Sequence, residues 1–133
     1  MRVASYGRKA LTLAKYYKDL IAWKKAIDLV ELIYRLTDKF PFSERTRLSD
    51  QLRRAAISVP SNIAEGQARY SPRDFARFLR TARASLAEIE TQLITAARLG
   101  HLNAETSAAA LQRADEVSRI VSGLLSAISA PAA

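Results

Sequence analysis

Arginine side chains are concentrated between residues 45 and 83, and their planar guanidinium groups are suited to binding phosphate oxygens in pairs. The candidates for binding are Arg45, Arg47, Arg53, Arg69, Arg73, Arg77, Arg80 and Arg83. At about 100° per residue, Arg73, Arg77 and Arg80 project from one side of a helix, and the apolar stripe of Phe75 and Leu79 lies roughly opposite. A solvated charged face would show the same arrangement. Because arginine predominates over lysine here, we predict that this face binds the phosphates of a polyanion without reading its sequence.

Polar residues form two further stripes, each beside an apolar face. The first consists of Gln51, Arg54, Ser58, Asn62 and Glu65, and the second consists of Thr81, Ser85, Glu88, Gln92 and Thr95. Members of each stripe recur at steps of three and four, which places them on one side of a helix. We expect the two stripes to meet in a half-buried network that fixes the pairing of two helices. In that network, Arg53 or Arg54 would pair with a glutamate of the second stripe or with Glu90. The alternative is a ligand groove, which we disfavour because no pocket-forming pattern accompanies the stripes.

Residues suited to catalysis or metal binding are scarce. The chain has no cysteine and one histidine, His101, which we expect to be solvent-exposed in a turn between helices. There is no glycine-rich phosphate loop, and no nucleophile, base and orienting acid can be assembled from nearby motifs. We therefore predict that the protein is not an enzyme and holds neither a cofactor nor a metal.

Charge and composition narrow the class of partner. The formal net charge is +8 over 133 residues, and a domain this basic attracts polyanions. Nucleic acid is the first expectation, an acidic protein surface the second and an anionic membrane the third. Basic residues interrupt the apolar runs near the start, and the uncharged run from 120 to 133 is too short and serine-rich to span a bilayer. With cysteine absent as well, we predict a cytoplasmic protein with no membrane partner.

The elements that must position these residues are helices. Apolar residues recur at steps of three and four almost throughout, and useful runs of period-two alternation are absent, which is typical of an all-α chain. Helices are predicted from about 19–23 to 39, from 48 to 66, from 72 to 99 and from 103 to 128. Ser71 and Pro72 should begin the third helix, and Gly100 should end it. Short connectors then predict an antiparallel up-down four-helix bundle.

Pro60 lies inside the second helical pattern, where it removes one backbone hydrogen bond. The apolar stripe keeps its phase across Pro60, so we predict a continuous, kinked helix, and the alternative is a helix that ends there and restarts at Ser61. Asn62 could serve carbonyl groups that Pro60 frees. Gly66 should end this helix and begin a turn that extends to Ser71.

The predicted domain organisation has three parts. Residues 1–18 carry five basic and no acidic side chains, and we expect a partly disordered basic extension, or alternatively a polyanion-binding tail. Residues 19–128 should form the bundle, and residues 129–133 should fray. The apolar arc of the first helix is wider than one packing seam requires, which indicates deep burial or a second partner, such as another copy of the chain.

A family resemblance is carried by the segments DLIAWKKA (19–26), IYRLT (33–37), FP (40–41), QLRRAAISVPSNIAEG (51–66), FLR (78–80) and SLAEIETQL (85–93). Together they resemble the four-helix-bundle proteins called 23S rRNA intervening-sequence proteins, of which the accessory protein of diversity-generating retroelements is a relative. The resemblance covers about residues 19–128. It implies a left-handed antiparallel bundle that assembles as a homopentamer with a basic surface, and it brings no catalytic residue.

Residues and resemblance together predict a non-enzymatic, oligomeric four-helix bundle that binds nucleic acid, with RNA favoured. The retroelement relative is understood to bind nucleic acid and a reverse transcriptase, and the resemblance implies similar partners for this chain. The alternative function for this chain is therefore a protein-interaction scaffold whose basic face docks an acidic partner, such as a reverse transcriptase.

Overall fold

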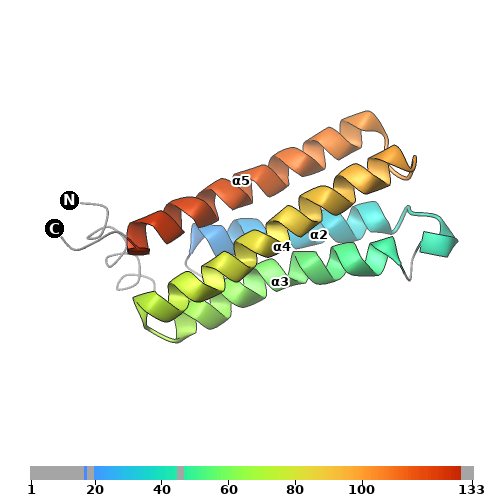
Figure 1. The fold of residues 1–133 in the computed structure, drawn as a ribbon. Helices are drawn as coiled ribbons and strands as arrows, with labels where there is room; N and C mark the ends of the chain where they lie inside the picture. Colours follow the sequence, from blue (N-terminus) through green and yellow to red (C-terminus); the bar gives the residue numbers. More distant parts are fainter. Residues whose placement is uncertain (1–16, 18–19, 45–46, 130–133) are drawn as a thin grey trace.

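The computed structural model describes residues 17, 20–44 and 47–129 of the chain. Its regular elements are α2 (Ile21–Thr37), the short 3₁₀ helix η2 (Phe42–Glu44), α3 (Leu48–Ala68), α4 (Pro72–Arg98) and α5 (Ala104–Ser129) (Figure 1). The described residues contain no strand. The all-α prediction is therefore confirmed for this part of the chain.

The four α-helices are arranged as a bundle. Each helix packs against the next one in sequence, and α5 also packs against α2, which closes the ring. The α3–α4 turn lies at one end of the bundle, and the α2–α3 and α4–α5 connectors lie at the other end (Figure 1). Successive helices therefore run in opposite directions, as the short connectors predicted.

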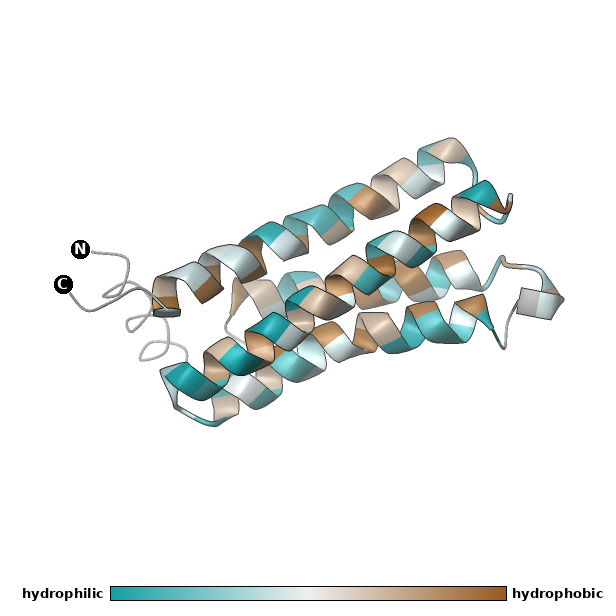
Figure 2. Cartoon of the chain, in the orientation of Figure 1, coloured by the Kyte–Doolittle hydropathy of each residue, from teal (hydrophilic) through white to brown (hydrophobic). Residues whose placement is uncertain are grey.

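The core of the bundle is built from the predicted apolar stripes. Its largest fully buried side chains include Leu29, Ile33, Leu52, Ile63, Phe75, Leu79, Leu86, Ile89, Leu93 and Val117. Hydrophobic and hydrophilic residues alternate around each helix, and hydrophilic residues are prominent on the first turns of α4 (Figure 2). One face of each helix is therefore buried, and the other carries the charge.

The bounds of α4 follow from its end residues. The Ser71 hydroxyl accepts a hydrogen bond from the Asp74 backbone N–H at 3.2 Å, and Pro72 occupies the first helical position. Gly100 follows the helix with a φ of +82°, a left-handed conformation that glycine adopts without strain. The sequence prediction of a helix from 72 to 99 is confirmed to within one residue.

The path of α3 confirms one prediction and corrects another. The helix is continuous across Pro60, as predicted. The predicted end at Gly66 is wrong, because α3 extends two residues further, to Ala68. A Cβ atom at Gly66 would lie 2.7 Å from the Phe78 Cβ and 3.1 Å from the Phe75 ring. Glycine is therefore needed here for the close approach of α4, and the left-handed residue of the turn is Tyr70, with a φ of +53°.

Two predicted regions fall largely outside the described residues. Of the basic extension at 1–18, only Tyr17 is described, and its ring contacts that of Trp23 at 5.3 Å between centroids. Of the segment at 129–133, only Ser129 is described, as the last residue of α5. Within the described chain, none of the helices is both long and apolar enough to cross a bilayer.

Candidate nucleic-acid interface

The outer face of α4 carries a row of exposed arginines. Arg73, Arg77, Arg80 and Arg83 are all exposed, whereas Phe75, Leu79 and Leu86 on the same helix are fully buried. Because α4 is unbroken, Arg73, Arg77 and Arg80 lie on the side of one rod opposite the buried stripe, and Arg83 lies on its flank. The row from Arg73 to Arg80 spans about 10 Å, at about 1.5 Å per residue. We call Arg69, Arg73, Arg77, Arg80 and Arg83 the α4 arginine face.

Phe78 holds two members of this face in place. The Cζ atoms of Arg69 and Arg77 lie 5.0 and 4.9 Å from the centroid of the Phe78 ring. Such cation–π contacts contribute about 0.5–1 kcal/mol each at exposed sites, and they restrict the arginine side chains. Phe78 can occupy this position because Gly66 leaves room for its Cβ atom. The fit of α3 against α4 therefore brings Arg69, just after α3, close to Arg77 on α4.

The negative charge beside this face is small. Arg69 pairs with Glu65 at 3.4 Å, one helical turn earlier, and both side chains are exposed. A pair of this kind is screened by solvent and salt, so it leaves Arg69 able to exchange its partner for a phosphate. The pairing also corrects a prediction, because Glu65 contacts Arg69 and not the polar network between α3 and α4.

Arg53 makes contacts within the bundle that sequence reasoning did not predict. Its Nε donates to the buried Thr37 hydroxyl at 2.8 Å, and its terminal nitrogen donates to Asp38 at 2.8 Å. Its guanidinium also lies over the Tyr34 ring, at 4.6 Å from the centroid. Arg53 therefore links α3 to the end of α2 by hydrogen bonds. The predicted pairing with Glu88 or Glu90 is wrong for Arg53, because two of its N–H groups donate to Thr37 and Asp38 instead.

Of the remaining predicted arginines, those that the structure describes do not join the α4 arginine face. Arg45 lies outside the described residues. Arg47 is exposed at the start of α3, about 30 Å along that helix from Arg69. Arg54 is exposed, and within the described chain no hydrogen bond or ion pair links it to Glu88 or Glu90.

Other polar residues do meet between α3 and α4, in two groups. In the first, the hydroxyls of Ser58 and Ser85 are 2.8 Å apart, and the Asn62 amide donates to the Ser58 hydroxyl at 3.0 Å. The same amide donates to the Ser58 carbonyl at 2.8 Å. The carbonyl freed by Pro60 belongs to Ala56, one turn before the proline, so Asn62 does not serve it.

The second polar group lies further along the same seam and centres on Gln92. The Gln92 amide nitrogen is 3.4 Å from both the Gln51 side-chain oxygen and the Glu88 carboxylate. Its own oxygen is buried and has no partner among the described residues. Thr81 and Thr95 donate to carbonyls of their own helix, at Arg77 and Thr91. The polar residues between α3 and α4 are therefore Gln51, Ser58 and Asn62 of α3 and Ser85, Glu88 and Gln92 of α4. None of these residues is an arginine.

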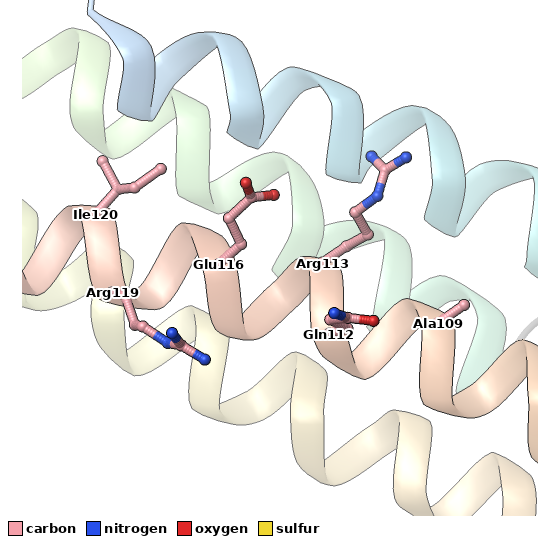
Figure 3. Close-up of a pocket in the computed structure, with 6 residues that line it drawn as sticks. All are labelled: Ala109, Gln112, Arg113, Glu116, Arg119 and Ile120. Atoms are coloured by element: carbon pink, nitrogen blue, oxygen red, sulfur yellow. The ribbon is translucent and has the colours of Figure 1, made fainter.

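The outer side of α5 has a shallow hollow of about 540 Å³. Its lining consists of Ala109, Gln112, Arg113, Glu116, Arg119 and Ile120, all from α5 (Figure 3). Glu116 and Arg113 point toward α2, whereas Arg119 points the opposite way, and Glu116 pairs with Lys25 of α2 at 3.4 Å. The hollow lies on the outer face of α5. The polar groups that line it do not converge on a common point, as ligand-binding groups do.

The structure places His101 in a less exposed position than the sequence predicted. It is half-buried, and its ring contacts that of Phe40 at 5.5 Å between centroids, which joins the α4–α5 connector to the end of α2. The expectation of a solvent-exposed loop histidine is therefore wrong. Over the described ranges, no three acidic, histidine or cysteine side chains form a group that could hold a metal ion.

The chain is similar in sequence and in fold to known proteins. The chain matches the family model described as 23S rRNA-intervening sequence protein over residues 18–123. It is also similar to a crystal structure from Bacteroides thetaiotaomicron, described as a protein of unknown function from the S23 ribosomal protein family. That similarity has a TM-score of 0.71 and 24% sequence identity, and it covers 83% of this chain and 100% of the other. At this identity the similarity shows a shared fold.

No curated protein matches the chain. Because the family match spans most of the sequence, the chain belongs to the 23S rRNA-intervening sequence protein family.

Proposed function

We propose that the protein is a non-enzymatic, oligomeric four-helix bundle that binds nucleic acid through the α4 arginine face. The observation that carries this proposal is the exposure of four arginines on α4, three of them on the side opposite its buried stripe. Arginine forks match the geometry of phosphate oxygens, and the net charge of +8 favours any polyanion.

RNA is the favoured ligand within this proposal. The family takes its name from intervening sequences of 23S rRNA, which supports RNA over DNA for this chain. The α4 arginine face has no amide or carboxylate side chains, the groups that read adenine and cytosine edges, so binding should depend mainly on phosphates.

A filter-binding titration with mixed RNA and mixed DNA, repeated as salt rises, tests the proposal. We expect binding at low salt and a steep loss as salt increases, because phosphate contacts release counterions. If all five arginines contact a single strand, the logarithm of affinity should fall with the logarithm of salt with a slope of about −3 to −4. Absent binding at low salt, or binding indifferent to salt, would rule the proposal out. A partner that remains after nuclease treatment would instead support the acidic-protein alternative.

We also propose that the chain assembles with copies of itself, with a pentamer favoured by the family resemblance. Half-buried or exposed apolar side chains recur along the α3 side of α2, at Trp23, Ile27, Val30 and Tyr34. Ile57 of α3 is 42% exposed and lies one turn after Arg53, which stacks on Tyr34. This outer apolar strip is the surface that a second copy would cover.

Substituting Ile57→Lys should weaken that assembly without unfolding the bundle, because Ile57 lies outside the buried core. Light scattering should report a multiple of the 14.7 kDa chain mass for the unmodified protein and a shift toward the monomer for the variant. Ile94→Lys, on α4, is the matched control, because Ile94 has nearly the same exposure, 44%, on a different helix. A monomer at micromolar concentration in the unmodified protein would contradict the proposal.

A further inference from the structure

Tyr70 stands in the α3–α4 turn in a conformation that bulky residues rarely adopt. Its φ is +53°, and its backbone N–H donates to the Gln67 carbonyl at 3.2 Å. Glycine or asparagine is the usual residue where a helix ends in this left-handed conformation. The chain instead keeps a large aromatic side chain there, 67% exposed, at a cost in backbone strain.

Two arginines lie close to Tyr70 in the sequence. Tyr70 directly follows Arg69 and is three residues before Arg73, in the turn between α3 and α4 at the end of the bundle where α4 begins (Figure 1). Arg69 itself is fixed against the Phe78 ring at 5.0 Å. An exposed aromatic ring next to a row of phosphate-binding cations is the combination by which proteins hold single strands, with a base stacked on the ring.

We infer that the α4 arginine face takes single-stranded nucleic acid, and that Tyr70 is the specificity-determining residue on which an unpaired base stacks. This inference rests on the proposed function, since the arginines supply the phosphate contacts. Bases in a duplex are already stacked on one another, so a duplex can use the arginines but cannot use the Tyr70 ring. The ring therefore adds affinity for one form of the ligand only.

The test compares an oligouridine strand with an RNA duplex, using fluorescence anisotropy at one low salt concentration and the full-length chain throughout. The variants are Tyr70→Asn, which removes the ring, and Tyr70→Phe, which keeps it. Asparagine adopts a positive φ more readily than tyrosine does, so the first variant relieves strain and should melt no lower than the unmodified protein.

We expect Tyr70→Asn to bind the single strand about 5- to 100-fold more weakly, with duplex affinity unchanged and with Tyr70→Phe close to the unmodified chain. Equal binding of strand and duplex, with no effect of Tyr70→Asn on either, would overturn the inference and leave the proposed function intact. Failure to bind either ligand at low salt would overturn both.

Discussion

Replacing Arg73, Arg77 and Arg80 with glutamine should lower the affinity for single-stranded RNA by on the order of 100-fold at low salt. Each exposed arginine beside a polyanion contributes about 1 kcal/mol, so three contribute about 3 kcal/mol. The salt slope should become shallower by about 2, because three phosphate contacts at about 0.7 each are lost. None of the three side chains is part of the core, so thermal stability should change little.

The matched control removes the same amount of charge elsewhere. Lys24, Arg35 and Arg113 are exposed on α2 and α5, away from the α4 arginine face. Substituting these three with glutamine also lowers the net charge from +8 to +5, since three positive charges are removed. We expect only a small loss of affinity from this control. Equal losses from the two triple variants would mean that total charge, and not the α4 arginine face, governs binding.

Substituting Gly66→Ala should destabilise the fold by about 1–2 kcal/mol. The added Cβ would lie 2.7 Å from the Phe78 Cβ, which is fixed to the α4 backbone and cannot rotate away. Such overpacking costs about 1–3 kcal/mol, and the better helix propensity of alanine offsets about 0.5–1 kcal/mol of that. A thermal melt at fixed protein concentration should show a fall of about 4 °C for each kcal/mol.

Gly123→Ala is the control, because it makes the same change in another helix where the new Cβ meets nothing within 4 Å. Here only the helix propensity term remains, so we expect a gain of about 0.5–1 kcal/mol. Stabilisation by both substitutions would show that the close approach of α3 and α4 is not as tight as described.

The features predictable from sequence were those set by local chemistry. The start of α4 depends on Ser71 and Pro72, and its end depends on Gly100, so neighbouring residues were enough to place both. The exposure of Arg73, Arg77 and Arg80 was likewise predictable, because helical periodicity relates them to the buried stripe on their own helix.

The features that sequence reasoning missed depend on contacts between helices. Gly66 has the same local signal whether it ends a helix or admits a neighbour, and only the position of Phe78 on α4 distinguishes the two. Arg53 was misassigned because its partners, Thr37 and Asp38, lie at the end of α2, and the pairing of α2 with α3 is not encoded locally. Tyr70 gave no signal, since its positive φ arises only where α3 actually ends.

Ultraviolet crosslinking of RNA to the full-length chain, followed by peptide mapping, tests most directly whether the α4 arginine face is the binding surface. We predict crosslinked peptides from residues 69–83, which contain Tyr70 and Phe78 beside the arginines. Crosslinks confined to residues 1–18 or to α5, with none from 69–83, would contradict the account.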